Sequence, residues 1–239
     1  QNVTDDASWK AAFERAQSLW GRVDVLVNNA GIVRPGSIET QSDAEWDAIL
    51  ATNLRAVVKG MQTAIGYMRK TGGGAIVNVA SIEGMIGEPL AMAYNASKGG
   101  VRIASKSAAK HCAAEGYGIR INCICPGIVK TYFAEALWKD PKVEKMMSEK
   151  LPMRRFGEPD DIAGVGRNLR FMQDNVKHRD RLAVWLIRTA APAHLKMLRR
   201  GLPALATPLP GDLCATFILP QQLAGTRFVS GLTHMNARI

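Results

Sequence analysis

The sequence has few cysteines, no long apolar run and no low-complexity tract, and each shortage excludes a class of protein. The longest apolar stretches are far shorter than the ~20 residues of a membrane helix, so we expect no membrane association. The four cysteines of the 239-residue chain show no paired zinc-type spacing. We therefore expect no metal site, reduced thiols and a cytoplasmic setting.

Positive charge is abundant but unevenly distributed along the chain. The net charge is +10, of which residues 1–165 carry +2 and residues 166–239 carry +8. No zinc-finger spacing or other nucleic-acid motif accompanies the basic part, so we do not expect nucleic acid as a partner. We instead expect a globular part over residues 1–165 and a divergent basic segment over 166–239 that is disordered or translated out of frame.

The most informative motif is Tyr94-Asn95-Ala96-Ser97-Lys98, preceded by Ser81. Residues four apart lie on one face of a helix. A lysine ammonium close to a phenol favours the phenolate and lowers its pKa, so the motif predicts a tuned proton donor or acceptor. Ser81 adds a hydroxyl that could hydrogen-bond a substrate oxygen. The same spacing also occurs on solvated helix faces, so the interpretation depends on the surrounding sequence.

Two short apolar runs supply that context. Residues 75–80 follow three glycines and are rich in β-branched side chains, which predicts a buried parallel strand. Ser81 would then lie at the carboxyl end of the strand, where open α/β sheets bind ligands. An earlier run, residues 24–27, leads into Asn28-Asn29-Ala30-Gly31. The alanine and glycine would let a flat ligand approach the backbone, although an ordinary turn is the alternative.

Strand-like and helix-like segments alternate along the chain. We expect helices over 9–20, 43–68 and 94–115 and a further strand over 118–125, with another helix beginning near residue 159. This alternation is typical of parallel βαβ units.

Taken in order, these motifs resemble the short-chain dehydrogenase/reductase family. The resemblance rests on residues 28–31, Asn53, Ser81, the Tyr94–Lys98 motif and Cys125-Pro126-Gly127, and it covers the chain to about residue 165. It implies an α/β fold with a Rossmann-like, doubly wound parallel sheet. It also implies hydride transfer between NAD or NADP and a secondary alcohol or ketone, including cyclic and hydroxysteroid-like ones. Two alternatives are a 3-oxoacyl-thioester reductase and a catalytically inactive fragment or paralogue.

The resemblance also implies a role for each matching residue. Tyr94 would be the acid or base, Lys98 would tune it and hold the nicotinamide ribose, and Ser81 would bind the substrate oxygen. Asn53 would hold a water that relays protons to Lys98, unless it is simply a helix-interior asparagine. Family members are usually oligomers, so we expect a dimer or tetramer that pairs through residues 101–109.

Further residues would contact the cofactor. Asn2 and Val3 would contact adenine, although Asn2 could equally be a frayed terminal residue. The remaining contacts implied by the resemblance are Asn28, Ala30, Gly31, Tyr94, Lys98, Pro126, Gly127, Val129 and Thr131. Two of these have plain structural alternatives, because Pro-Gly is a common loop pair and Thr131 could be a helix N-cap.

The sequence departs from the family pattern in two places. It has no glycine-rich G-x-x-x-G-x-G segment before residue 24, so we expect a sheet truncated at its N-terminal side. Residues 154–163 match a late turn and helix start of the family, but residues 166–200 do not, and 211–215 and 228–231 echo it only faintly. We interpret this as a frameshift, an unspliced segment or a fusion.

Overall fold

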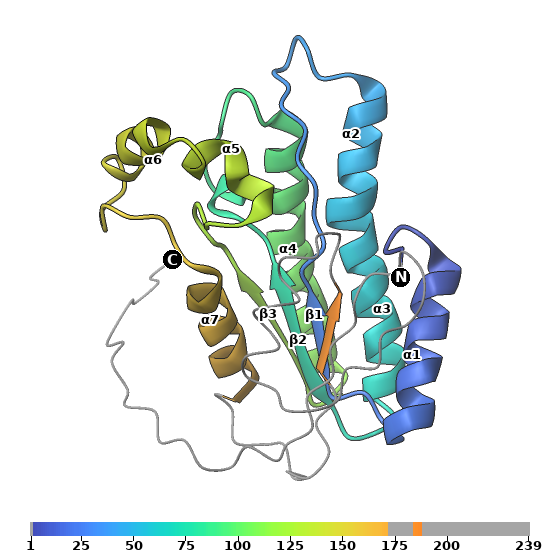
Figure 1. The fold of residues 1–239 in the computed structure, drawn as a ribbon. Helices are drawn as coiled ribbons and strands as arrows, with labels where there is room; N and C mark the ends of the chain where they lie inside the picture. Colours follow the sequence, from blue (N-terminus) through green and yellow to red (C-terminus); the bar gives the residue numbers. More distant parts are fainter. Residues whose placement is uncertain (1, 172–183, 188–239) are drawn as a thin grey trace.

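A parallel sheet lies at the centre of the computed structural model, which describes residues 2–171 and 184–187 (Figure 1). Its strands, in chain order, are β1 (Val25–Asn28), β2 (Gly74–Val79), β3 (Ile119–Ile124) and β4 (Val184–Ile187). They lie in the order β3-β2-β1-β4, and every pairing between neighbours is parallel. The strands predicted over 24–27, 75–80 and 118–125 are confirmed to within a residue.

Helices cover the sheet on both sides. Helix α1 (Asp6–Trp20), α3 (Ala56–Met68) and α4 (Met92–Ala114) share one core with Leu26 and Ile76. The neighbouring strand residues Val25 and Ala75 pack in a separate small cluster, as expected when side chains alternate across a sheet. Helix α7 (Pro159–Phe171) contacts β2 and β3 and lies on the side away from α1 and α3 (Figure 1). This arrangement confirms the Rossmann-like, doubly wound α/β fold.

Capping residues determine where several helices begin and end. The Asp5 carboxylate accepts hydrogen bonds from the backbone N–H groups of Ala7 and Ser8, at 3.1 and 3.0 Å, and so caps the start of α1. Gly21 ends the helix with a φ of 72°, a conformation that favours glycine. Ser42 caps α2 (Asp43–Leu50) through the N–H of Glu45.

One long helix was predicted over residues 43–68, and the structure confirms it with one irregularity. Helices α2 and α3 are joined without a break by a π-helical turn, η1 (Ala51–Arg55). The N–H of Ala56 reaches back to the carbonyl of Ala51, which widens the helix locally. Such π turns are rare and occur often at functional sites, and this one contains Asn53.

Short elements follow the carboxyl ends of the strands. The turn η2 (Ile82–Gly84) follows β2, and η3 (Tyr132–Ala134), α5 (Glu135–Trp138) and α6 (Pro141–Ser148) follow β3. Asp140 caps α6 by accepting a 2.8 Å hydrogen bond from the N–H of Lys142. Within the described residues, no helix has the length and apolar character needed to cross a membrane.

The C-terminal part of the chain contributes two described elements. Helix α7 continues across the boundary expected after residue 165. Strand β4 is formed by an apolar stretch within the basic segment. Its register pairs Trp185 with Leu26 of β1. Strand β1 is therefore paired with a neighbouring strand on both of its edges, with β2 on one and β4 on the other. The faint echoes at 211–215 and 228–231 lie outside the described residues, as does most of the segment interpreted as out of frame.

Candidate active site

Ser81, Tyr94, Lys98 and Gly31 come together at the carboxyl ends of the central strands. Ser81 follows β2, Gly31 follows β1, and Tyr94 and Lys98 lie in the first turns of α4. The Ser81 hydroxyl is a hydrogen-bond partner of the Tyr94 phenol, and Lys98 Nζ lies 5.6 Å from the centre of the Tyr94 ring. A Cβ placed on Gly31 would lie 3.4 Å from Lys98 Nζ. Tyr94 and Lys98 therefore lie side by side on one face of α4, as their spacing of four residues predicts.

The turn after Ser81 packs closely against α4. Ser81 Oγ accepts a 3.1 Å hydrogen bond from the backbone N–H of Glu83, which fixes the start of η2. A Cβ on Gly84 would lie 2.7 Å from the backbone carbonyl oxygen of Lys98, so only glycine permits this approach. Arg102 of α4 donates a 2.8 Å hydrogen bond to the Gly84 carbonyl. These contacts hold Ser81 at a fixed position relative to Tyr94.

Asn53 is fully buried and connects three parts of the site. Its side-chain amide exchanges two 2.8 Å hydrogen bonds with the backbone of Ile32, which fixes the loop after β1. The same amide donates to Ser97 Oγ at 3.2 Å, and Ser97 Oγ donates to the Tyr94 carbonyl at 2.7 Å. Asn53 thus positions both the loop and the helix. Its expected part in a water relay stays a prediction, and Ser97, inside the predicted motif, was missed as a positioning residue.

The pKa values of the two titratable groups move in opposite directions. Burial lowers the pKa of the Lys98 ammonium to about 8, which the nearby Cys123 and Cys125 thiols partly oppose. Lys98 Nζ donates a 2.9 Å hydrogen bond to the Val79 carbonyl. Burial also raises the pKa of the Tyr94 phenol, against the hydrogen bond from Ser81 and together with the charge of Glu83.

This result corrects one expectation from the sequence. We expected Lys98 to lower the pKa of Tyr94, but the net pKa is raised in this structure. The physical reason is that the phenol is only 9% exposed, so loss of water disfavours its anion. Lys98 is itself a weakened cation because it is buried too.

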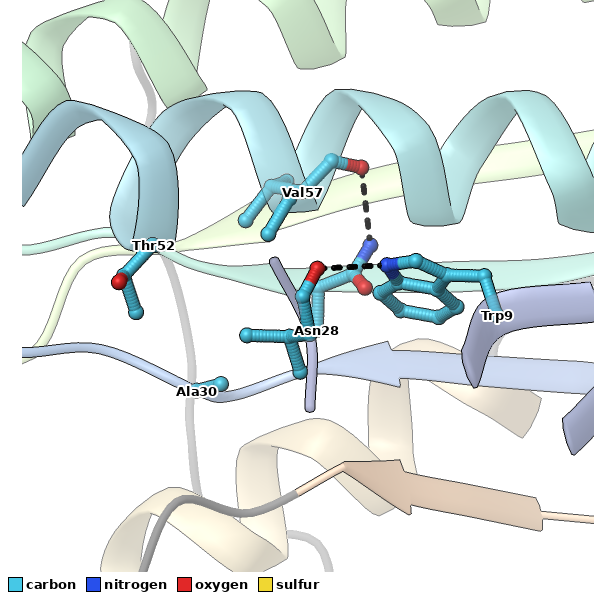
Figure 2. A pocket seen from close by; sticks show the side chains of 7 residues that line it. Trp9, Asn28, Ala30, Thr52 and Val57 are labelled. Atoms are coloured by element: carbon cyan, nitrogen blue, oxygen red, sulfur yellow. Dashed lines mark hydrogen bonds between the residues drawn. The ribbon is translucent and has the colours of Figure 1, made fainter. Parts of the chain in front are cut away.

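An apolar pocket lies beside the loop that follows β1 (Figure 2). Its lining residues are Val3, Trp9, Asn28, Ala30, Thr52, Ala56 and Val57. The indole N–H of Trp9 donates a 2.8 Å hydrogen bond to the Val3 carbonyl, which holds the N-terminal segment against the pocket. Three predicted cofactor contacts, Val3, Asn28 and Ala30, therefore share one pocket.

Two asparagines among the predicted cofactor contacts, Asn28 and Asn2, make hydrogen bonds within the protein. The Asn28 amide donates a 2.8 Å hydrogen bond to Asn78 Oδ1, and Asn78 in turn donates to Ser105 Oγ at 2.8 Å. Asn28 therefore links β1 to β2 and α4 while it borders the pocket. Asn2 is exposed, and its side chain accepts a 3.0 Å hydrogen bond from the N–H of Thr4. It does not line the pocket, and its expected adenine contact stays a prediction.

The segment after β3 runs beside the turn that carries Ser81. The Pro126 carbonyl accepts a 3.0 Å hydrogen bond from the N–H of Ile82, while Gly127 is exposed. Val129 forms an isolated parallel bridge with Gly157. Thr131 precedes η3, but its hydroxyl donates to the Val129 carbonyl at 3.4 Å and makes no capping bond.

One side chain that the sequence did not single out, Phe133, lies beside Tyr94. The Phe133 ring of η3 lies 6.0 Å from the Tyr94 ring, tilted by 42°. Large apolar side chains follow Ser81 and are more than half exposed: Met85, Ile86 and Leu90. The only signal for Phe133 in the sequence was its place two residues after Thr131, which the family resemblance puts beside the cofactor.

Comparisons with known proteins identify the family of the chain. Residues 1–170 match the family model described as enoyl-(acyl carrier protein) reductase. The chain is 42% identical over 167 residues to an NADP-dependent (R)-specific alcohol dehydrogenase of Lentilactobacillus kefiri, covering 69% of this chain and 65% of that protein. It is 39% identical over 164 residues to a 3-oxoacyl-[acyl-carrier-protein] reductase of Thermotoga maritima, with the same coverage.

Solved structures give the same result. A structure from Sinorhizobium meliloti 1021 assigned as a short-chain alcohol dehydrogenase matches with a TM-score of 0.66 and 36% identity, covering 71% of this chain and 67% of that one. One from Agrobacterium tumefaciens assigned as a gluconate dehydrogenase matches with a TM-score of 0.67 and 30% identity, covering 71% and 66%. The chain spans 65% of the length of the curated relatives it matches. By its motifs, its fold and these matches, the chain belongs to the short-chain dehydrogenase/reductase family.

Proposed function

We propose that this chain reduces a ketone to a secondary alcohol, and catalyses the reverse reaction, with NAD or NADP as the hydride carrier. The observation that carries the proposal is the buried cluster in which Ser81 bonds the Tyr94 phenol beside the Lys98 ammonium. The cluster lies at the carboxyl ends of parallel strands, where such sheets bind dinucleotides. Relatives with alcohol dehydrogenase and 3-oxoacyl reductase names support the reaction class.

The residues present fit a nicotinamide dinucleotide. Among the hydrogen bonds of the described residues, Lys98 Nζ makes one, to the Val79 carbonyl. An ammonium has three donors, so it keeps donors for ribose hydroxyls. The absence of a side chain on Gly31 leaves room beside Lys98 Nζ, since a Cβ there would lie 3.4 Å from it. Ala30 and Val3 border the small pocket of Figure 2, and the adenosine side would lie against them. When bound, the cofactor supplies or accepts the hydride.

The chain's own residues would move the proton. During reduction the Tyr94 hydroxyl gives its proton to the carbonyl oxygen, and Ser81 Oγ donates a hydrogen bond to the same oxygen as negative charge develops there. The raised pKa of Tyr94 keeps the phenol protonated at neutral pH, which is the form that gives its proton during reduction. Lys98 then assists the return of a proton to Tyr94, and Asn53 and Ser97 hold the helix and the loop in position.

The surroundings favour an apolar ketone. Met85, Ile86 and Leu90 follow Ser81 and are 53%, 58% and 61% exposed, and the Phe133 ring lies over Tyr94. These side chains would wall a substrate with apolar groups on the carbonyl carbon. A 3-oxoacyl thioester is the second candidate, because a relative 39% identical to this chain is named a 3-oxoacyl-[acyl-carrier-protein] reductase.

Nicotinamide fluorescence during titration of the chain with NADPH and NADH tests the proposal. We expect saturable binding of at least one nucleotide. The reduced nucleotide should then be oxidised when a ketone such as acetophenone, whose reduction gives a secondary alcohol, is added. Acetoacetyl-N-acetylcysteamine, in parallel, tests the thioester alternative. Faster reduction of this thioester than of the ketone would favour the second candidate.

Tyr94→Phe is the matched control, because it keeps the ring that packs against Phe133 and removes only the hydroxyl. We expect nucleotide binding to persist and turnover to fall by about 10²–10⁴-fold, the usual contribution of a positioned acid. Binding without turnover in the unchanged chain, or no binding at millimolar nucleotide, would instead support an inactive family member.

The assembly and the location of the protein belong to the same proposal. We infer a homodimer or homotetramer that pairs along α4, because Ile103 on this helix is 63% exposed while Val101 is buried in its own chain. Free cysteines at 112, 123 and 125 are compatible with a cytoplasmic, reducing setting. Light scattering coupled to size exclusion should give a multiple of the 26.0 kDa chain mass, and Ile103→Lys should dissociate it.

A further inference from the structure

Arg102 lies one helical turn beyond Lys98, and the proposed mechanism gives it no part. Residues four apart lie on one side of a helix, so Tyr94, Lys98 and Arg102 follow one another along α4 toward its C-terminus. The Arg102 side chain is half-buried and reaches out of α4 to the turn η2, where its Nη1 atom donates a 2.8 Å hydrogen bond to the Gly84 carbonyl. A third side chain of α4 is therefore attached to the turn that begins at Ser81.

The turn η2 is fixed by different contacts at its two ends. At its start, Ser81 Oγ accepts a 3.1 Å hydrogen bond from the N–H of Glu83, and the N–H of Ile82 donates to the segment after β3 at 3.0 Å. At its end, the Gly84 carbonyl accepts the hydrogen bond from Arg102, and no other hydrogen bond of the described residues reaches this carbonyl. The guanidinium of Arg102 therefore fastens the far end of the turn to α4.

The turn and the helix meet too closely for the turn to shift without changing this bond. A Cβ on Gly84 would lie 2.7 Å from the backbone carbonyl oxygen of Lys98, so backbone lies against backbone here. A guanidinium is planar and holds its donors in fixed directions, so its bond to Gly84 sets the orientation of the turn on the helix. Because the N–H of Glu83 occupies one lone pair of Ser81 Oγ, the orientation of the turn also decides where the Ser81 hydroxyl lies.

We propose that Arg102 is a positioning residue for the reaction, which holds the end of η2 on α4 and thereby keeps the Ser81 hydroxyl beside Tyr94. This inference rests on the proposed ketone reduction. Arg102 acts through Ser81 and does not touch the substrate. Misplacement of a catalytic group by about 1 Å can cost roughly 10²-fold in rate, so a loosened turn lowers turnover although every reacting group is still present.

A double-mutant cycle tests whether Arg102 acts through Ser81. Steady-state constants for acetophenone are measured in the unchanged chain, Arg102→Met, Ser81→Ala and the double variant. We expect Arg102→Met to lower kcat about tenfold and to change KM less than about twofold, because the lost alignment matters in the transition state. In the Ser81→Ala background, Arg102→Met should leave kcat nearly unchanged, because no hydroxyl remains to be positioned.

Two further variants separate positioning from the loss of a charge. Arg102→Lys keeps a charged donor at this position and should restore part of the lost turnover. Lys110→Met removes an exposed cation two turns further along α4 and should leave kcat unchanged. An equal fall of kcat with and without the Ser81 hydroxyl would overturn the inference, as would an unchanged kcat in Arg102→Met, and both results would leave the proposed function intact.

A second measurement decides the role of Arg102 without turnover. No turnover of the ketone in the unchanged chain would overturn the proposed function, and the near-ultraviolet absorbance of the Tyr94 phenolate during alkaline titration would still report the position of Ser81. The hydrogen bond from Ser81 lowers the pKa of this phenol, against its burial. The matching Tyr94→Phe protein is subtracted in each background to remove the other tyrosines. The charged groups beside the phenol, Glu83 and Lys98, are the same in all four proteins.

We expect Arg102→Met to move the Tyr94 transition to higher pH, because the hydrogen bond from Ser81 is weakened. The same substitution should not move the transition in Ser81→Ala. A shift of equal size in both backgrounds would show that Arg102 acts by its charge alone, and no shift in either would show that it does not position Ser81. Both results would overturn the inference.

Discussion

Replacing the buried lysine should stabilise the chain at neutral pH. Lys98 is only 4% exposed, and burial lowers its pKa from 10.5 to about 8. Because the pKa of Lys98 is lower in the folded state, its amine binds a proton more tightly in the unfolded chain. Protonation of Lys98 therefore lowers the free energy of unfolding. The resulting penalty is fully present below pH 8, shrinks between pH 8 and 10.5, and disappears above 10.5. Lys98→Met removes the penalty at every pH.

The magnitude follows from the size of the shift. Each pKa unit corresponds to about 1.36 kcal/mol, so the change from 10.5 to about 8 costs roughly 3 kcal/mol at pH 7. At pH 9.5 the same linkage leaves roughly 1 kcal/mol. The substitution also removes the hydrogen bond from Lys98 Nζ to the Val79 carbonyl, which costs about 1 kcal/mol. That loss varies little with pH, so the pH dependence separates the two effects.

Urea unfolding of the chain and of Lys98→Met at pH 7, 8 and 9.5 measures this difference. We expect the free energy of unfolding of Lys98→Met, relative to the unchanged chain, to fall by about 2 kcal/mol between pH 7 and 9.5. Cys112, Cys123 and Tyr94, whose pKa values burial raises, also titrate at high pH. Cys112 is present in both proteins, so its effect cancels. Cys123, with a pKa of about 11, and Tyr94, with a pKa raised above its usual 10, keep most of their protons up to pH 9.5 and add little to the difference. A difference that is constant with pH would refute the argument.

Two further predictions concern the frame that carries the site. Gly73→Ala should lower the free energy of unfolding by at least ~1–3 kcal/mol, because φ is 110° and a Cβ would lie 2.3 Å from the Gly118 carbonyl oxygen. Gly66→Ala, in α3 with open space around it, is the matched control and should raise it by ~0.5–1 kcal/mol. Asn78→Ala should cost about 2 kcal/mol, since it removes buried hydrogen bonds to Asn28 and Ser105. Urea unfolding measures all three, and unchanged midpoints would contradict them.

Periodicity and spacing predicted most of the fold and the centre of the site. The strands and long helices are local patterns, and the Tyr94–Lys98 spacing on one helix leaves little freedom for where the two side chains point. Ser81 could be placed because parallel strands end at the same edge of a sheet. These inferences needed no knowledge of distant contacts, and the structure agrees with them.

The features that were missed depend on contacts between distant segments. Strand β4 has only four residues, and it forms a strand because it pairs along β1. The π turn at Ala51–Arg55 shifts the backbone hydrogen bonds within a sequence that reads as an ordinary helix. The direction of the Tyr94 pKa was wrong for the same reason, because the motif shows a neighbouring cation but not how deeply the phenol is buried.

The opposite pKa changes of Tyr94 and Lys98 follow from one cause, and together they set how the rate of each direction depends on pH. Burial disfavours both charged forms, so the phenol retains its proton and the ammonium loses part of its charge near pH 8. Oxidation of an alcohol requires the phenolate, which the site opposes, and the Glu83 carboxylate adds to that opposition. Reduction requires the neutral phenol, which the site favours. The single-turnover rate of alcohol oxidation should therefore rise with pH as the phenol loses its proton, and Glu83→Met should move that rise to lower pH, which stopped-flow rates over a pH series would reveal.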